Sequence, residues 1–102
     1  MQIQVRVSKR SDEIAEQVRA YAEYRIFSAI AGKGSEVGLV AVHLSTREIP
    51  PIGRTATCIV SVRLRHEVVR VKARSTHPAA AIDTAAARLA DAIAPEPRMA
   101  QP

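Results

Sequence analysis

The stretch VSVRLRHEVVRVKAR, residues 60–74, alternates apolar with polar side chains and contains five cations and one acid. Because successive side chains of a β-strand point to opposite faces, this alternation predicts strands with one apolar and one basic face. The pair His66-Glu67 interrupts the alternation and predicts a two-residue hairpin turn. In the corresponding register Leu64 pairs with Val69, and both side chains point toward the core.

The basic face of this predicted hairpin brings like charges together. Arg63 is expected directly opposite Arg70, an arrangement that destabilises a strand pair by a few tenths to about 1 kcal/mol. A bound anion such as a phosphate backbone would remove that cost, and each neutralised phosphate releases counterions. The alternative is that the outward charges protect a strand edge from aggregation. The sequence favours anion binding.

The rest of the chain adds two further strands and two helices to this hairpin. Residues 1–7 alternate in the same way, and Ser11 before two acids indicates a helix start. Pro50 and Pro51 predict a loop, because proline cannot donate to a sheet ladder. The predicted elements are a strand over 1–7, a helix over 12–31, a strand from 39 that ends before the prolines, a loop over 48–54, strands over 55–65 and 68–74, and a helix from 78 to 94.

The order β-α-β-β-β-α predicts an α+β fold, with a four-stranded mixed sheet and two helices packed on one face. A strand-helix-strand connection makes the first two strands parallel, and the remaining three strands form an antiparallel meander. Each helix has one apolar stripe, so both are expected to cover the same face and to leave the basic face open to solvent. The sheet residues expected to be buried are Cys58, Val60, Val62, Val69 and Val71.

The length of 102 residues predicts a single domain, residues 1–94, followed by a disordered tail over 95–102. No apolar run approaches the roughly 18 residues that a membrane span requires, and the amino terminus does not have the pattern of a signal peptide. A cytoplasmic protein is therefore expected. Cys58 is the only cysteine, which excludes a disulfide within the chain and suits a reducing compartment.

Positive charge is concentrated in the middle of the chain. Residues 37–74 contain seven cations and two acids, whereas the flanking thirds are nearly balanced, and the net charge is +5. This distribution favours a polyanionic partner, either nucleic acid or an anionic membrane surface. The three aromatic residues all lie in the predicted helix over 12–31. Contacts to phosphate are therefore expected, rather than base stacking on the sheet.

Catalytic and metal-binding interpretations find little support in the sequence. His43, His66 and His77 are scattered, with no Cys or second His at ligand spacing, so no metal site and no cofactor are expected. Asp83 is interpreted as a partner of the helix dipole in the first turn of the second helix. The chain is therefore expected not to be an enzyme and to have no small-molecule substrate.

Two segments, IAEQVRAYAEYRI at 14–26 and HPAAAIDTAAARLADAI at 77–93, resemble the bacterial ribosome hibernation-promoting factors, also called ribosomal subunit interface proteins. The resemblance spans about residues 1–94 and is to a short, divergent form of that family. It implies a fold similar to double-stranded-RNA-binding-like folds. It also implies binding in the channel of the small ribosomal subunit where messenger and transfer RNA sit, which silences translation without chemistry. The family's helix cations for ribosomal RNA match Arg19, Arg25 and Arg88.

The expected interface combines these helix cations with those of the open sheet face. The expected RNA-binding residues are Arg6, Arg19, Arg25, Arg63, Arg65, Arg70, Lys72, Arg74 and Arg88. The expected partner is the small ribosomal subunit with its ribosomal RNA, and no membrane partner is expected. The alternative is a protein-interaction module, in which Leu39, Ile59 and Val68 among the arginines contact a second copy or an acidic partner. The oligomeric state stays open.

Overall fold

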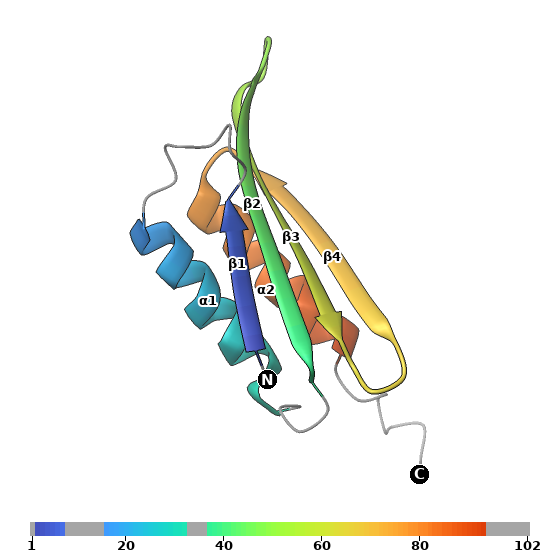
Figure 1. The fold of residues 1–102 in the computed structure, drawn as a ribbon. Helices are drawn as coiled ribbons and strands as arrows, with labels where there is room; N and C mark the ends of the chain where they lie inside the picture. The colour runs from blue at the N-terminus through green and yellow to red at the C-terminus, as the bar shows by residue number, and fades with distance from the viewer. Residues whose placement is uncertain (1, 8–15, 33–36, 94–102) are drawn as a thin grey trace.

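The computed structural model describes residues 2–7, 16–32 and 37–93 (Figure 1). The predicted helix start at Ser11 and the predicted tail over 95–102 lie outside these residues. The elements are β1 (Gln2–Val7), α1 (Glu16–Ile30), β2 (Leu39–Ile49), β3 (Gly53–Arg63), β4 (Val68–Ser75) and α2 (Pro78–Ile93). This succession confirms the predicted order β-α-β-β-β-α.

The four strands form one mixed sheet in the order β1-β2-β3-β4. β1 is parallel to β2, and the β2–β3 and β3–β4 pairs are antiparallel. Figure 1 shows α1 and α2 side by side behind the sheet, so that one face is covered and the other is open. The predicted α+β architecture is thus confirmed. None of the helices in the described ranges is long and apolar enough to cross a membrane.

The core lies between the covered sheet face and the two helices. Alternate residues of β2 and β3, including Val42, Leu44, Cys58, Val60 and Val62, are at most 2% exposed. The helices add Ala22, Ile26, Ile30, Ala81, Ile82, Ala85, Ala86, Leu89 and Ile93 to the same cluster. Every second sheet residue points inward, and the helix residues recur every three or four positions, as amphipathic elements require. Val69 and Val71 were expected to be buried but are only half-buried, because β4 is an edge strand.

The thiol of Cys58 lies fully inside this core. Burial raises its pKa to about 12, because desolvation disfavours the thiolate. Only the thiolate attacks a disulfide reagent, so labelling of the native protein by a water-soluble thiol reagent is expected to be slow. The same reagent is expected to react rapidly in denaturant, and a spectrophotometric time course in both conditions measures the difference. Rapid labelling without denaturant would contradict the position of Cys58 in the core.

The turn between β3 and β4 differs by one residue from its predicted position. The backbone N–H of Leu64 donates to the carbonyl of Glu67 at 2.8 Å, so the turn is Arg65-His66 rather than His66-Glu67. Arg63 consequently pairs with Val68, and the prediction that Arg63 lies directly opposite Arg70 is wrong. In the observed register each residue of β3 pairs with the residue of β4 that lies two positions before the predicted one. Every apolar side chain therefore stays on the same face of the sheet as predicted. The hydrophobic pattern therefore could not distinguish the two registers.

The turn between β2 and β3 is shorter than the predicted loop over 48–54. Glu48 pairs with Arg54 and Ile49 with Gly53, so only residues 50–52 lie outside the two strands. Pro50 and the following proline occupy the turn itself, where no ladder donor is needed, and they do not prevent pairing on either side. Gly53 has a φ of 97°, a conformation that favours glycine.

The β2–β3 pair also extends beyond its neighbours (Figure 1). Among the described residues, β1 pairs with β2 only as far as Leu44, and β4 pairs with β3 only as far as Ala56. Residues 47–55, which we call the hairpin tip, therefore form a two-stranded ribbon within the described part of the chain. The side chains of Glu48 and Arg54 form an ion pair across it at 3.7 Å.

Candidate nucleic-acid interface

The open face of β4 presents a row of cations. Arg70, Lys72 and Arg74 occupy alternate positions of the strand and are exposed, and we call them the cation row. Alternate residues of a strand are about 7 Å apart on one face. Their partners on β3 are uncharged, since Arg70 pairs with Ser61 and Lys72 with Ile59. The positive charge is thus arranged along one strand rather than opposed across two.

A second position of positive charge lies at the turn end of the same hairpin. Arg63 ends β3 and Arg65 lies in the turn, and both side chains are exposed. Arg6 lies on the opposite edge strand, where it pairs with His43. Across the sheet, His43 of β2 and Ile59 of β3 lie between Arg6 and Lys72 of the cation row. At ordinary strand spacing the backbones of Arg6 and Lys72 are therefore about 14 Å apart. The predicted open-face cations therefore share one face but do not form one cluster.

Arg88 joins the cation row from the helical layer. Its Nη1 donates a hydrogen bond to the backbone carbonyl of Lys72, at the outer edge of β4. A shallow hollow of about 330 Å³ at this edge is lined by Lys72, Ala73, Arg74 and Arg88. We call Lys72, Arg74 and Arg88 the basic edge. Sequence reasoning treated the hairpin and helix cations as separate groups, because nothing in the spacing of α2 indicates which strand edge it meets.

Arg25 lies elsewhere, between the two helices. Its Nε contacts Oδ1 of Asp83 at 2.9 Å, and the hydroxyl of Tyr21 donates to the same carboxylate oxygen. Asp83 was interpreted as a dipole partner, and sequence reasoning missed this cluster because its members are 58 and 62 residues apart. The expected RNA contact of Arg25 stays a prediction, and its guanidinium already has a carboxylate partner.

The two bonds from Tyr21 and Arg25 hold the pKa of Asp83 below its ordinary value, with the Tyr21 hydroxyl the larger cause. The same hydrogen bond raises the pKa of Tyr21. A carboxyl with a lowered folded-state pKa adds stability above its unfolded pKa, and that stability is lost as the pH falls through the folded value. This loss is expected below about pH 4, the ordinary range of aspartate.

Asp83→Asn is therefore expected to destabilise the protein slightly at pH 7, by about 1 kcal/mol or less because the cluster is partly exposed. The stability of the variant is also expected to fall less between pH 7 and pH 3 than that of the parent, because the variant lacks the Asp83 carboxyl whose protonation removes stability. Thermal melts between pH 3 and pH 7 measure both effects. Asp91→Asn, an exposed position of the same helix, is the matched control. Equal pH profiles for the two variants would contradict a stabilising role of the cluster.

Arg19, the remaining helix cation, lies on the side of α1 that faces β1. Its Nε is 3.9 Å from Oε2 of Glu16, one turn earlier in the helix. The three helix cations matched to the family thus occupy three separate places: beside β1, between the helices and at the outer edge of β4. Within the described ranges, no group of three or more His, Cys, Asp or Glu residues could hold a metal ion.

Comparison with known proteins identifies similar folds. Neither a family model nor a curated protein matches the sequence. A ribosomal subunit interface protein from Coxiella burnetii superposes with a TM-score of 0.76 at 15% identity, over 91% of this chain and 93% of that one. The N-terminal domain of Protein Y from Thermus thermophilus superposes with a TM-score of 0.69 at 25% identity, over 90% of this chain and 94% of that one. Both likenesses therefore span nearly the whole length of each pair of chains.

Proposed function

We propose that the chain, which shares its fold with a ribosomal subunit interface protein and with the N-terminal domain of Protein Y, is a member of the hibernation-promoting factor family. In this proposal it binds the small ribosomal subunit through RNA and thereby modulates or silences translation. The proposed role is non-catalytic, because occupying a site on the subunit is sufficient to block it. A protein of this kind works in the cytoplasm, where the subunits are.

The observation that supports this proposal most directly is the basic edge together with the rest of the cation row. Lys72 and Arg74 from β4 meet Arg88 from α2 around one hollow, and Arg70 continues the row along the strand. Cations that converge from two layers of a fold can contact neighbouring phosphates of one RNA backbone. Each neutralised phosphate releases counterions, which makes such contacts favourable at low salt.

The composition of the open face indicates how RNA would be recognised. The three aromatic residues of the chain are all on α1, and the centre of the open face has His43, Ile59 and small or hydroxyl-bearing residues such as Ala41 and Ser61. Unpaired bases bind RNA-recognising sheets by stacking on aromatic rings. The proposed contacts are therefore to phosphates and to RNA shape, with little dependence on base sequence.

Cosedimentation with separated ribosomal subunits across a salt series tests this function. Binding to the small subunit is expected, and it is expected to weaken steeply between about 50 and 200 mM salt if several phosphates are contacted. Binding to neither subunit at any salt concentration would refute the proposal.

A second candidate function rests on a specific feature of the same face. Leu39 and Val68 are 37% and 61% exposed, and they flank Arg63 at one end of the sheet. Exposed apolar side chains around a cation are typical of a surface that contacts protein. A salt-independent association with a protein, or with a second copy of this chain, would favour this protein-interaction module over the RNA-binding function.

A further inference from the structure

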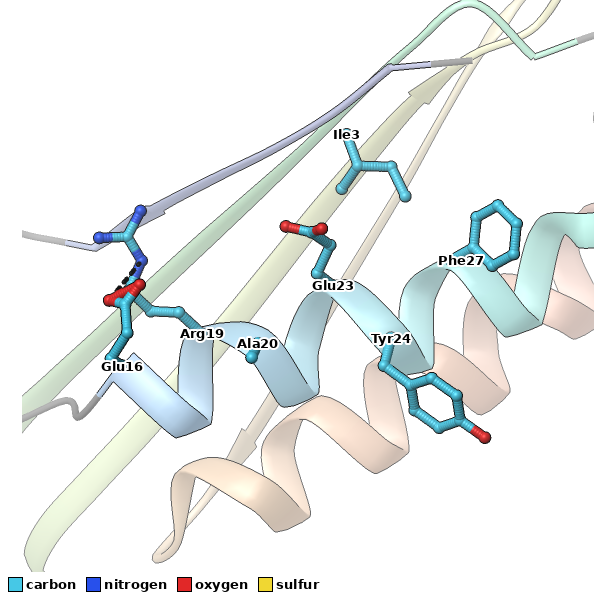
Figure 2. A pocket seen from close by; sticks show the side chains of 7 residues that line it. All are labelled: Ile3, Glu16, Arg19, Ala20, Glu23, Tyr24 and Phe27. Carbon is cyan, nitrogen blue, oxygen red and sulfur yellow. Dashed lines mark ion pairs between the residues drawn. The ribbon is translucent and has the colours of Figure 1, made fainter.

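A groove lies between α1 and the outer edge of β1, away from the basic edge (Figure 2). It has a volume of about 580 Å³ and is lined by Ile3, Glu16, Arg19, Ala20, Glu23, Tyr24 and Phe27. Figure 2 shows Glu23 and Phe27 on the side of the helix toward Ile3, whereas Tyr24 extends away from it. The groove therefore has an apolar part between Ile3 and Phe27 and a charged part along the helix.

The charge of this groove is opposite to that of the chain. Among the described residues that line it, the charged groups are the carboxylates of Glu16 and Glu23 and one cation, Arg19, which pairs with Glu16. The chain as a whole has a net charge of +5, and its excess of basic over acidic residues lies in residues 37–74. A phosphate backbone would be repelled by the acids here, whereas a cationic segment would be attracted.

The backbone beside the groove can accept a further strand. β1 is the first strand of the sheet, and among the described residues it pairs only with β2. The N–H and C=O groups of a strand edge are a template for another extended chain. A peptide that adds to an edge gains main-chain hydrogen bonds, and its alternate side chains enter the pockets on one face.

We propose that the groove between β1 and α1 binds an extended protein segment that adds to β1 as a fifth strand and that has both lysine or arginine and apolar side chains on its helical face. The side chains on the helical side of this strand would place apolar groups against Ile3 and Phe27. Its cations would meet Glu23 and, further along the helix, Glu16. This surface lies at the opposite edge of the sheet from the basic edge and the cation row, so a partner here leaves both of them accessible.

The test uses the complete chain alone, so its outcome is independent of ribosome binding. The probe is a short, fluorescently labelled peptide in which lysine and valine take turns at every second position and threonine fills the positions between them, so that lysine and valine share one face of the strand. Its binding is measured by anisotropy. Saturable binding is expected, together with slower hydrogen exchange of the β1 amides. No binding is expected for the counterpart that has glutamate in place of every lysine, or for a lysine-valine peptide interrupted by proline, which cannot form a continuous ladder.

Glu23→Lys is expected to weaken binding of the lysine-valine peptide by about tenfold, because it replaces attraction by repulsion at the centre of the groove. The control Glu67→Lys makes the same charge change at an exposed position between β3 and β4 and is expected to leave the affinity unchanged. Equal binding of the glutamate-valine peptide, equal effects of the two variants or unprotected β1 amides would each overturn the proposal. A dimer of the free protein that dissociates on Glu23→Lys would also overturn it, since the occupant would then be a second copy.

Discussion

Replacing Lys72 and Arg74 together by glutamate is expected to lower the affinity for the small ribosomal subunit by roughly tenfold to a hundredfold. Both residues belong to the basic edge and are exposed on β4, so the double change removes two phosphate contacts and adds two repulsive charges. The slope of log affinity against log salt is expected to fall by about two, one for each phosphate lost. Cosedimentation at several salt concentrations measures both quantities.

The matched control is Arg47→Glu combined with Arg54→Glu in the hairpin tip. It changes the net charge by the same amount, at exposed positions of β2 and β3 that do not line the hollow of the basic edge. A much smaller loss of affinity is expected for this control. Equal losses for the two double variants would show that binding follows the net charge of the chain rather than the basic edge, and the proposed interface would then be wrong.

Leu89→Ala is expected to lower the free energy of unfolding by about 2 to 5 kcal/mol. Leu89 is fully buried in α2, where the helix packs on β3 and β4, and truncation leaves a cavity that the surrounding side chains fill only in part. Small domains are stable by only about 5 to 15 kcal/mol, so this single change removes a large fraction of the total. Urea denaturation followed by circular dichroism measures the loss.

Leu39→Ala is the control for that measurement, because it deletes the same atoms from a side chain that is 37% exposed on the open face. A loss below about 1 kcal/mol is expected, as for most surface substitutions. Comparable losses at the two positions would show that α2 is not docked on the sheet in solution. The m-values of both variants are expected to equal that of the parent, since neither change alters the surface exposed on unfolding.

The sequence was sufficient to predict the architecture because the apolar residues of the strands and helices recur with a period that places them on one face of each element. Few arrangements of these elements bury all of the apolar faces together. The alternation of Cys58, Val60 and Val62 assigns β3 a covered face, and the spacing of Ile82 and Leu89 assigns α2 an apolar stripe. A sheet with one apolar face and two helices with one stripe each can be assembled in few ways. The predicted order, strand directions and covered face all follow from this constraint.

The details that were wrong or missed depend on contacts that no local pattern contains. A register shift of two residues preserves the face of every side chain, so the turn at Arg65-His66 could not be distinguished from its neighbour. The Arg25–Asp83 ion pair joins residues far apart in the chain. The same is true of Arg88, whose approach to Lys72 depends on how α2 lies along β4. Predicting which cations act together therefore required the tertiary structure.

The local stability of β2 and β3 differs between the four-stranded part of the sheet and the two-stranded hairpin tip. From Val40 to Leu44, β2 is bonded on both sides and packed under the helices, whereas residues 47–49 have one bonded neighbour among the described residues. A two-stranded ribbon is only marginally stable without further support. Its amides are therefore expected to exchange through local opening, while those of the four-stranded part exchange only through global unfolding. We therefore expect the tip to change its twist against a surface while the buried residues of the four-stranded part keep their packing.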